Sequence, residues 1–206
     1  MARFIALEGG EAAGKSTQAA LLAQHLGAVL TREPGGTELG EALRRILLDP
    51  GLPPPVARAE ALLMLAARAQ HVAEVIEPAL ARGQDVVCDR FSGSTLAYQG
   101  YGRGLDVAEL AALDRWATAG REPDVVVLLA VPAPVARRRR DGGGDRFEEE
   151  DCEFRRRVED GFAALAAAHP ERWRTVDGTR SIEEVARAVR AAVGQTLGQA
   201  TSAGKK

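Results

Sequence analysis

The chain has 206 residues, enough for one domain with a sizeable core, and its 27 basic and 29 acidic residues give a formal net charge of −2. This balance argues against a protein that binds nucleic acid through bulk positive charge, and no apolar stretch approaches the roughly 20 residues that a membrane-spanning helix needs. Two cysteines are too few for a disulfide framework, so we expect a cytoplasmic protein. Together with the charge and the absence of a long apolar stretch, this predicts no membrane or nucleic-acid partner.

Strands and helices are expected to alternate along the chain. Apolar runs predict five strands, at residues 3–8, 27–31, 85–89, 124–131 and within 172–178. Amphipathic stretches predict helices at residues 15–26, 38–48, 56–82, 107–119, 148–168 and 181–197. Pro78 predicts a kink or break in the third helix, and Ser181 with Glu184 predicts a capping box at the start of the last one. This alternation predicts an α/β fold with a five-stranded parallel sheet flanked by helices.

The first strand leads into the sequence GGEAAGKST, where glycines, a lysine and a serine follow the spacing G-x-x-x-x-G-K-[ST]. Glycines let backbone N–H groups approach phosphate oxygens, and the helix that follows points its positive end at the anion. The lysine can reach the β- and γ-phosphates, and the serine hydroxyl can bind Mg²⁺. We expect a nucleoside-triphosphate site made by Gly9, Gly10, Glu11, Ala12, Ala13, Gly14, Lys15, Ser16 and Thr17.

A second candidate site lies at the end of the third strand, where Asp89 and Arg90 follow an apolar run. A carboxylate at the carboxyl end of a strand beside a phosphate loop can hold Mg²⁺ or its waters, so Ser16 and Asp89 are candidate metal ligands. The arginine can bind a second phosphate through two of its N–H groups. An ordinary ion pair at the end of a strand is the alternative.

The stretch RRRRDGGGDRFEEED at residues 137–151 resembles a mobile lid, because four adjacent arginines repel one another unless an anion binds, and three glycines follow. Arginine stabilises the charge that develops during phosphoryl transfer. A solvated basic patch or a weak nucleic-acid contact is the alternative. We expect a single domain over residues 1–200 with a lid at about 136–150, and a disordered tail at 201–206.

Three further stretches carry a resemblance to a known family: TREPGGTELGEALRRILLDP, AARAQHV and DRFSGSTLAYQGYGRG. They resemble the thymidylate kinases, and the likeness runs from Phe4 to about Glu184. It implies a P-loop NTPase three-layer fold and a kinase that phosphorylates dTMP to dTDP with ATP and Mg²⁺. It also implies a homodimer, formed through the helices around residues 56–82 and 92–119.

The resemblance implies roles in binding the acceptor nucleotide. Arg90 would hold its phosphate with Arg32 nearby, and Arg68 would donate to the carbonyl edge of thymine. Tyr98 would lie beside the deoxyribose and leave no room for a 2′-hydroxyl. The same pocket would also contain Ser94, Thr95 and Gln99.

One position departs from the family pattern. Four residues before Arg68, many members have a phenylalanine that stacks on thymine, whereas this chain has Met64. A thioether packs on an aromatic face more softly than a ring does. A core-filling role on the helix is the alternative for Met64.

Thymidylate kinases carry their catalytic arginines either in the phosphate loop or in the lid. The loop offers none here, because two alanines follow Glu11, so the chain resembles the lid type. The lid offers five candidates, Arg137, Arg138, Arg139, Arg140 and Arg146, of which we favour Arg139 and Arg146 as acting together with Lys15 and Arg90. The resemblance places Glu11 near the acceptor or near the waters of Mg²⁺.

Two other functions remain open from the sequence. One is another nucleoside monophosphate kinase or a deoxynucleoside kinase, which a panel of acceptors would distinguish. The other is an ATP-binding sensor without turnover. An Asp-Arg pair and an arginine-rich lid argue against a sensor, because binding alone does not need them.

Overall fold

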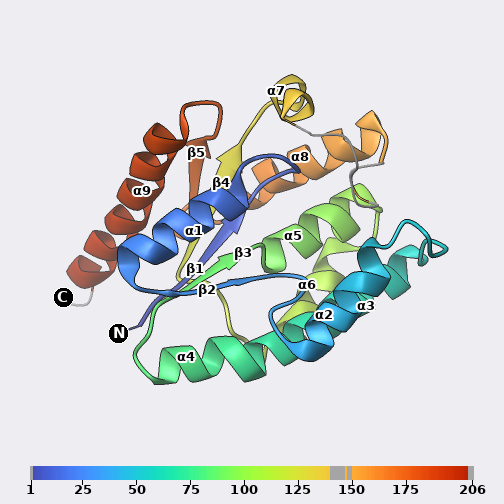
Figure 1. Cartoon of the computed structure of the whole chain (residues 1–206), viewed down its shortest axis with the longest axis horizontal. Coiled ribbons are helices and arrows are strands. Elements are labelled where there is room, and N and C mark those ends of the chain that lie inside the picture. The colour runs from blue at the N-terminus through green and yellow to red at the C-terminus, as the bar shows by residue number, and fades with distance from the viewer. Residues whose placement is uncertain (1, 140–146, 148–149, 204–206) are drawn as a thin grey trace.

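The computed structural model describes residues 2–139, 147 and 150–203, with the side chains of the last helix described as far as residue 194 (Figure 1). Its centre is a five-stranded sheet in which all neighbouring strands are parallel, in the order β2-β3-β1-β4-β5. The strands are β1 (Phe4–Glu8), β2 (Val29–Arg32), β3 (Val86–Asp89), β4 (Val125–Ala130) and β5 (Trp173–Asp177). The sequence-based prediction of a parallel five-stranded sheet is confirmed.

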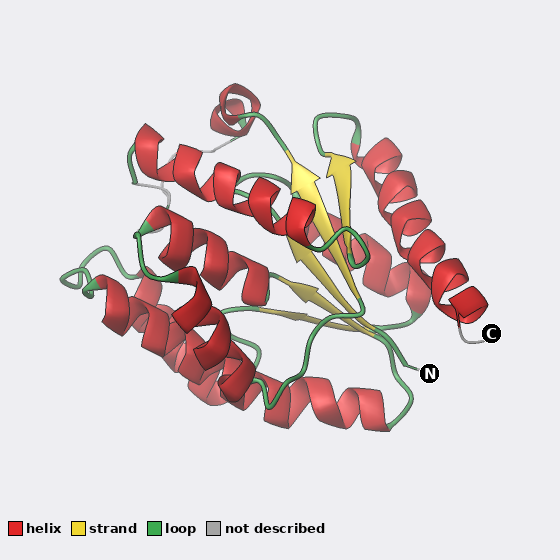
Figure 2. Ribbon diagram, turned by 180° about the vertical axis from the view of Figure 1, so that it is seen from behind, coloured by secondary structure: helices red, strands yellow, loops and turns green. Residues whose placement is uncertain are grey.

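Helices cover both faces of this sheet (Figures 1 and 2). The helices are α1 (Lys15–Leu26), α2 (Glu38–Leu48), α3 (Ala57–His71), α4 (Glu77–Ala81), α5 (Ser92–Thr95), α6 (Val107–Ala117), α7 (Ala133–Arg138), α8 (Cys152–Ala168) and α9 (Ile182–Ala203). Two π-helical segments join this list, η1 (Val72–Ile76) and η2 (Leu96–Gly102).

The central strand β1 shows why both faces are covered. Ile5 and Leu7 pack with α1 and α9 in one core cluster, whereas Phe4 and Ala6 pack with η1 and α4 in another. Side chains alternate between the faces of a strand, so an uninterrupted apolar run needs helices on both sides. All four side chains are fully buried.

The third predicted helix is not regular along its length: a π-helical segment separates α3 from α4 just before Pro78, where a kink or break was expected. The chain runs from α3 through η1 into α4, and Pro78 lies in the first turn of α4. A proline ring clashes with the carbonyl four residues earlier in a regular helix. The backbone N–H of Glu77 bonds the carbonyl of Val72, which is the wider π-type turn, and this widening accommodates the ring.

The helix predicted from residue 107 begins there as α6, because Asp106 caps it by accepting from the N–H of Glu109 at 2.8 Å. Another predicted helix start differs. The helix that was expected to begin at residue 148 is α8, and it begins at Cys152. Asp151 caps it by accepting from the N–H of Phe154 at 2.7 Å. The expected capping box at the start of α9 is present, with Ser181 and Glu184 bonding each other's backbone N–H groups.

The C-terminal helix extends further than expected, because α9 continues to Ala203 rather than ending at residue 197.

None of the helices in the described ranges combines the length and the apolar composition that crossing a membrane requires.

The fold brings two loops to one edge of the sheet. β1 pairs with β3 so that Leu7 lies beside Asp89, and the N–H of Arg90 bonds the carbonyl of Leu7 at 2.9 Å. The segments that follow β1 and β3 therefore leave from adjacent strands. In open parallel sheets, ligands bind at this carboxyl edge.

Candidate active site

The loop after β1 has the backbone shape of a phosphate cradle. Gly9 has φ 143° and Gly14 has φ 89°, both in a region that favours glycine. A Cβ on Gly9 would lie 2.6 Å from the carbonyl oxygen of Leu129, so only glycine lets the loop rest on the end of β4. Gly14 caps α1, whose free N–H groups therefore face the loop.

Lys15 is the buried cation of this loop. It is 6% exposed, and its Nζ donates to the carbonyl of Gly10 at 2.6 Å. Burial and the charge of Arg90 lower the pKa of Lys15 to about 8, against the opposing effect of nearby carboxylates. An arriving polyphosphate would favour the charged ammonium, which makes this site suited to binding anions.

The two candidate metal ligands lie in contact. The Oγ of Ser16 donates to Asp89 Oδ2 at 2.5 Å. Asp89 Oδ1 is buried and has no hydrogen-bond partner in the described part of the chain. A buried carboxylate oxygen without a partner beside a hydroxyl suits Mg²⁺, which takes oxygen ligands.

Arg90 occupies the space between the two loops. Its backbone has φ 71°, uncommon for a residue other than glycine. Its Nη1 donates to the carbonyl of Gly9 at 3.0 Å and to the Oγ of Ser94 at 3.1 Å, and its Nη2 donates to Glu11 at 2.5 Å. Tyr98 donates its hydroxyl to the same carboxylate at 2.8 Å. The guanidinium is thus held in place beside the phosphate loop.

Glu8 holds the segment that carries Arg90, and the sequence analysis did not identify it. The side chain is fully buried, and it accepts from the N–H groups of Phe91 and Ser94 and from the Ser94 hydroxyl, at 3.0, 3.1 and 2.6 Å. Burial raises the pKa of Glu8 to about 7, although these hydrogen bonds and Arg90 oppose the shift. An acidic residue at the carboxyl end of a strand beside a phosphate motif was the available signal.

Arg68 is anchored by two carboxylates. Its Nε donates to Glu33 at 2.7 Å and its Nη1 to Asp114 at 2.5 Å, and the guanidinium lies 5.1 Å from the ring centroid of Phe91. Burial opposes the charge, but the carboxylates outweigh it and raise the pKa of Arg68 above its usual value. Glu33 and Asp114 were not among the predicted site residues.

A single cavity of about 260 Å³ brings most of the predicted residues together. From the loop and β3 it is lined by Glu11, Lys15, Ser16 and Asp89. All eight predicted substrate-binding residues line it as well: Arg32, Met64, Arg68, Arg90, Ser94, Thr95, Tyr98 and Gln99. The walls also contain residues that were not predicted: Glu33, Pro34, Arg44, Leu48 and Phe147.

Of the two predicted lid arginines, only Arg139 is described, and it does not line this cavity. Arg139 is exposed and follows the last residue of α7, while Arg146 lies outside the described residues. Phe147 lines the cavity and packs edge-on against the ring of Tyr98, with 5.6 Å between centroids. Phe147, which falls within the expected lid, therefore contributes an aromatic side chain to the cavity wall.

Comparisons with known proteins show which family this chain resembles. The family model for thymidylate kinase matches residues 7–189. Thymidylate kinase of Synechococcus sp. (strain JA-3-3Ab) is 53% identical over 190 residues, which are 89% of this chain and 91% of the relative. Thymidylate kinase of Alkalilimnicola ehrlichii is 47% identical over 203 residues, covering 95% of this chain and 94% of the relative.

A solved structure has the same fold. The crystal structure of thymidylate kinase from Ehrlichia chaffeensis superposes with a TM-score of 0.78 at 34% sequence identity, covering 94% of this chain and 98% of that one. The expected family and fold class are confirmed, and the chain belongs to the thymidylate kinase family.

Proposed function

We propose that the protein transfers the γ-phosphoryl group of ATP to dTMP, forming ADP and dTDP. The observation that carries this proposal is the single cavity whose wall contains both the loop lysine Lys15 and the anchored Arg68. Membership of the thymidylate kinase family supports the assignment of donor and acceptor.

Phosphoryl transfer between these nucleotides needs little covalent chemistry from the protein. The phosphate of dTMP already carries nucleophilic oxygens, so positioning and charge neutralisation supply the catalysis. The N–H groups of the loop and Lys15 hold the triphosphate of ATP, and Arg90 holds the phosphate of dTMP. Glu11, 2.5 Å from Arg90 Nη2, keeps the guanidinium oriented toward that phosphate.

Ser16 and Asp89 would hold Mg²⁺, a role supported by the partnerless Oδ1 of Asp89. When bound, the ion neutralises charge on the β- and γ-phosphate oxygens. The lid arginines Arg139 and Arg146 would stabilise charge on the transferring group from the other side.

The far part of the cavity would bind the nucleoside. Arg68 donates to the carbonyl edge of thymine, and Met64 packs against the face of the base. Ser94, Thr95 and Gln99 complete the walls, and Tyr98 lies where a 2′-hydroxyl would project. A pocket with fixed polar groups discriminates strongly against a ligand that leaves them unpaired.

We also propose a homodimer that forms through α3 and α6, in a cytoplasmic protein. The two helices pack together and carry exposed apolar side chains, of which Trp116 is 83%, Leu62 58% and Leu113 45% exposed. Exposed apolar patches of this kind mark association surfaces. Cys88 and Cys152 are free thiols, which supports a reducing compartment.

An acceptor panel tests the proposed reaction. A coupled assay of ADP release with dTMP, dUMP, UMP, CMP and thymidine should give the highest kcat/KM for dTMP. A preference for UMP or CMP would assign the protein to another nucleoside monophosphate activity, and a preference for thymidine to a nucleoside kinase. ATP binding in calorimetry with no turnover of any acceptor would favour a sensor.

A further inference from the structure

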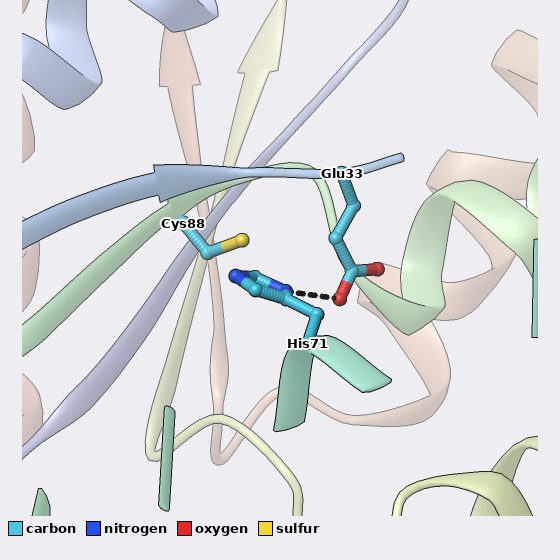
Figure 3. A group of neighbouring side chains, drawn as sticks. All are labelled: Glu33, His71 and Cys88. Atoms are coloured by element: carbon cyan, nitrogen blue, oxygen red, sulfur yellow. Dashed lines mark hydrogen bonds and ion pairs between the residues drawn. The ribbon is translucent and has the colours of Figure 1, made fainter. Parts of the chain in front are cut away.

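Three buried side chains from separate elements meet next to the acceptor cavity. Glu33 follows β2, His71 ends α3, and Cys88 lies in β3 (Figure 3). All three are buried, and one potential metal-ligating atom from each lies within 4.8 Å of those of the other two. The cluster therefore needs a physical explanation of its own.

Hydrogen bonds among the described residues already occupy these groups, which argues against a metal site. The Cys88 thiol donates to the carbonyl of Arg90 at 3.0 Å. Burial and the neighbouring carboxylates raise the pKa of that thiol well above its usual value, so it stays protonated. His71 Nδ1 bonds Glu33 and its Nε2 faces the hydroxyl of Thr31.

The bonds of His71 form a short chain that ends on Arg68. A carboxylate only accepts, so His71 donates its Nδ1–H to Glu33 Oε1, at 2.8 Å. The other oxygen of Glu33 accepts from Arg68 Nε at 2.7 Å. Thr31 Oγ1 lies 2.6 Å from His71 Nε2 and fixes the far side of the imidazole ring. Each member of the chain is thus held in orientation by the next.

The contacts of Arg68 leave its side chain little conformational freedom. It is 3% exposed, and its Nε and Nη1 bind Glu33 and Asp114 while Phe91 lies beneath the guanidinium. Its Nη2 has no hydrogen-bond partner among the described residues, and the side chain lines the acceptor cavity. The direction of this remaining donor therefore depends on the orientation of Glu33.

The loop after β2 is shaped to enclose the imidazole. Gly36 has φ 79°, and a Cβ at this position would lie 2.7 Å from Cδ2 of His71 and 2.8 Å from Thr31 Oγ1. Only glycine allows the loop to close over the ring at this distance. Gly36, the second glycine of PGG, is therefore needed for the loop to pack against His71 and Thr31.

We infer that His71 is a positioning residue for recognition of the base: it holds Glu33, which directs Arg68 toward the nucleobase of the acceptor. This inference rests on the proposed function, because it takes the base as the ligand of Arg68. His71 does not line the cavity and acts through Glu33 on Arg68, which binds the base rather than the reacting phosphate, so its loss affects binding of dTMP rather than the phosphoryl-transfer step.

Kinetics of two variants test the inference. His71→Phe keeps an aromatic side chain but removes both ring nitrogens, and we expect the KM for dTMP to rise about tenfold, the loss expected when a buried hydrogen bond is broken. The kcat and the KM for ATP should remain within about twofold of wild type, since only binding of the base depends on Arg68. His71→Asn, which restores an N–H near the position of Nδ1, should bring the KM for dTMP back to within about threefold.

Ile76→Val is the matched control, because Ile76 is fully buried in η1 and shares a core cluster with Cys88 and Phe91, but its apolar side chain makes no hydrogen bond to Glu33 or Arg68. It should lower the melting temperature and leave the KM for dTMP unchanged. An equal rise in the KM for dTMP in Ile76→Val, or a His71→Asn variant as impaired as His71→Phe, would overturn the inference. If His71→Phe does not fold, Thr31→Val should still raise the KM for dTMP two- to threefold, and an unchanged value would refute it.

Arg68→Lys separates this inference from the proposed function. If Arg68→Lys raises the KM for dTMP and His71→Phe does not, the positioning role fails while the assignment of the base site stands. If the wild-type protein does not phosphorylate dTMP, the proposed function itself fails.

Discussion

Glu8 is a fully buried carboxyl group whose pKa of about 7 couples folding to pH. The pKa of a glutamate in an unfolded chain is about 4.3. Between about pH 4.3 and the pKa of Glu8 in the folded protein, about 7, the native state therefore binds the proton more tightly than the unfolded state. Stability should therefore fall as pH rises from about 4.5 to about 7, by up to about 3 kcal/mol from this group.

Glu8→Gln should remove that dependence, because the amide is neutral at every pH and still accepts from Phe91 and Ser94. We expect the free energy of unfolding of the variant, relative to wild type, to increase between pH 5 and pH 8. Urea denaturation at four pH values across this range measures the difference. Profiles that stay parallel would show that Glu8 does not retain its proton in the folded protein.

Lys15 is the residue on which turnover is expected to depend most. Lys15→Ala removes the ammonium from the phosphate loop, and kcat should fall by at least about 10² while the protein remains folded. The assay is ADP release at saturating dTMP, with the melting temperature as a check on folding. His25→Ala, an exposed change in the last turn of the same helix, should leave kcat unchanged. Equal kcat for Lys15→Ala and wild type would contradict the assignment.

The sequence predicted those site residues whose roles depend on local order. Lys15 and Ser16 follow from the spacing of one loop, and Asp89 from the end of one apolar run. Glu33 and Asp114 could not be found this way, because each lies far along the chain from Arg68, 35 and 46 residues away. Such pairings arise only when tertiary packing brings distant carboxylates to the same cation.

At the scale of elements, glycine marks the closest helix contact. η2 and α8 pack so tightly that a Cβ on Gly161 would lie 2.8 Å from the ring of Tyr101. In α9, by contrast, a Cβ on Gly194 would meet nothing within 4 Å. Both glycines lie inside helices, so the same substitution should have opposite effects at the two sites.

Gly161→Ala should destabilise the protein by about 1–3 kcal/mol through overpacking, which exceeds the gain in helix propensity. Gly194→Ala should stabilise it by about 0.5–1 kcal/mol, because only propensity changes. Chemical denaturation of the two variants beside wild type provides the comparison. Stabilisation by both changes would mean that η2 and α8 are not in close contact.

Periodicity predicted the elements better than their ends. The strands β1, β3 and β4 followed directly from apolar runs, and the capping box at Ser181 located the start of α9. The two π-helical segments carried no comparable signal, because a single widened turn changes the period over only a few residues. The start of α8 is fixed by the side chain of Asp151, which accepts a backbone N–H. The sequence did not single out Asp151, because several acidic residues just before it could cap a helix equally well.

At the scale of the whole molecule, the exposed face of α3 and α6 is expected to bind a second copy. Trp116→Arg places a charge in that face and should convert a dimer into a monomer, since an unpaired buried charge is costly. Light scattering coupled to size exclusion gives the mass. Ile182→Arg is the control, because Ile182 is also exposed but lies in α9, across the sheet from α3 (Figure 1). A wild-type protein that elutes as a monomer, or a Trp116→Arg variant that remains dimeric, would contradict this interface.

The chain contains only three lysines, and two of them are its last residues, so Lys15 is the single amine of the folded body apart from the amino terminus. Its pKa of about 8 leaves a large unprotonated fraction in mildly alkaline buffer, whereas an ordinary lysine would stay almost entirely charged. A small acylating reagent that enters the cavity would therefore modify this nitrogen in preference to the two C-terminal lysines. Bound ATP would shield it, so the labelled fraction of one tryptic peptide would report nucleotide occupancy without an engineered reporter group.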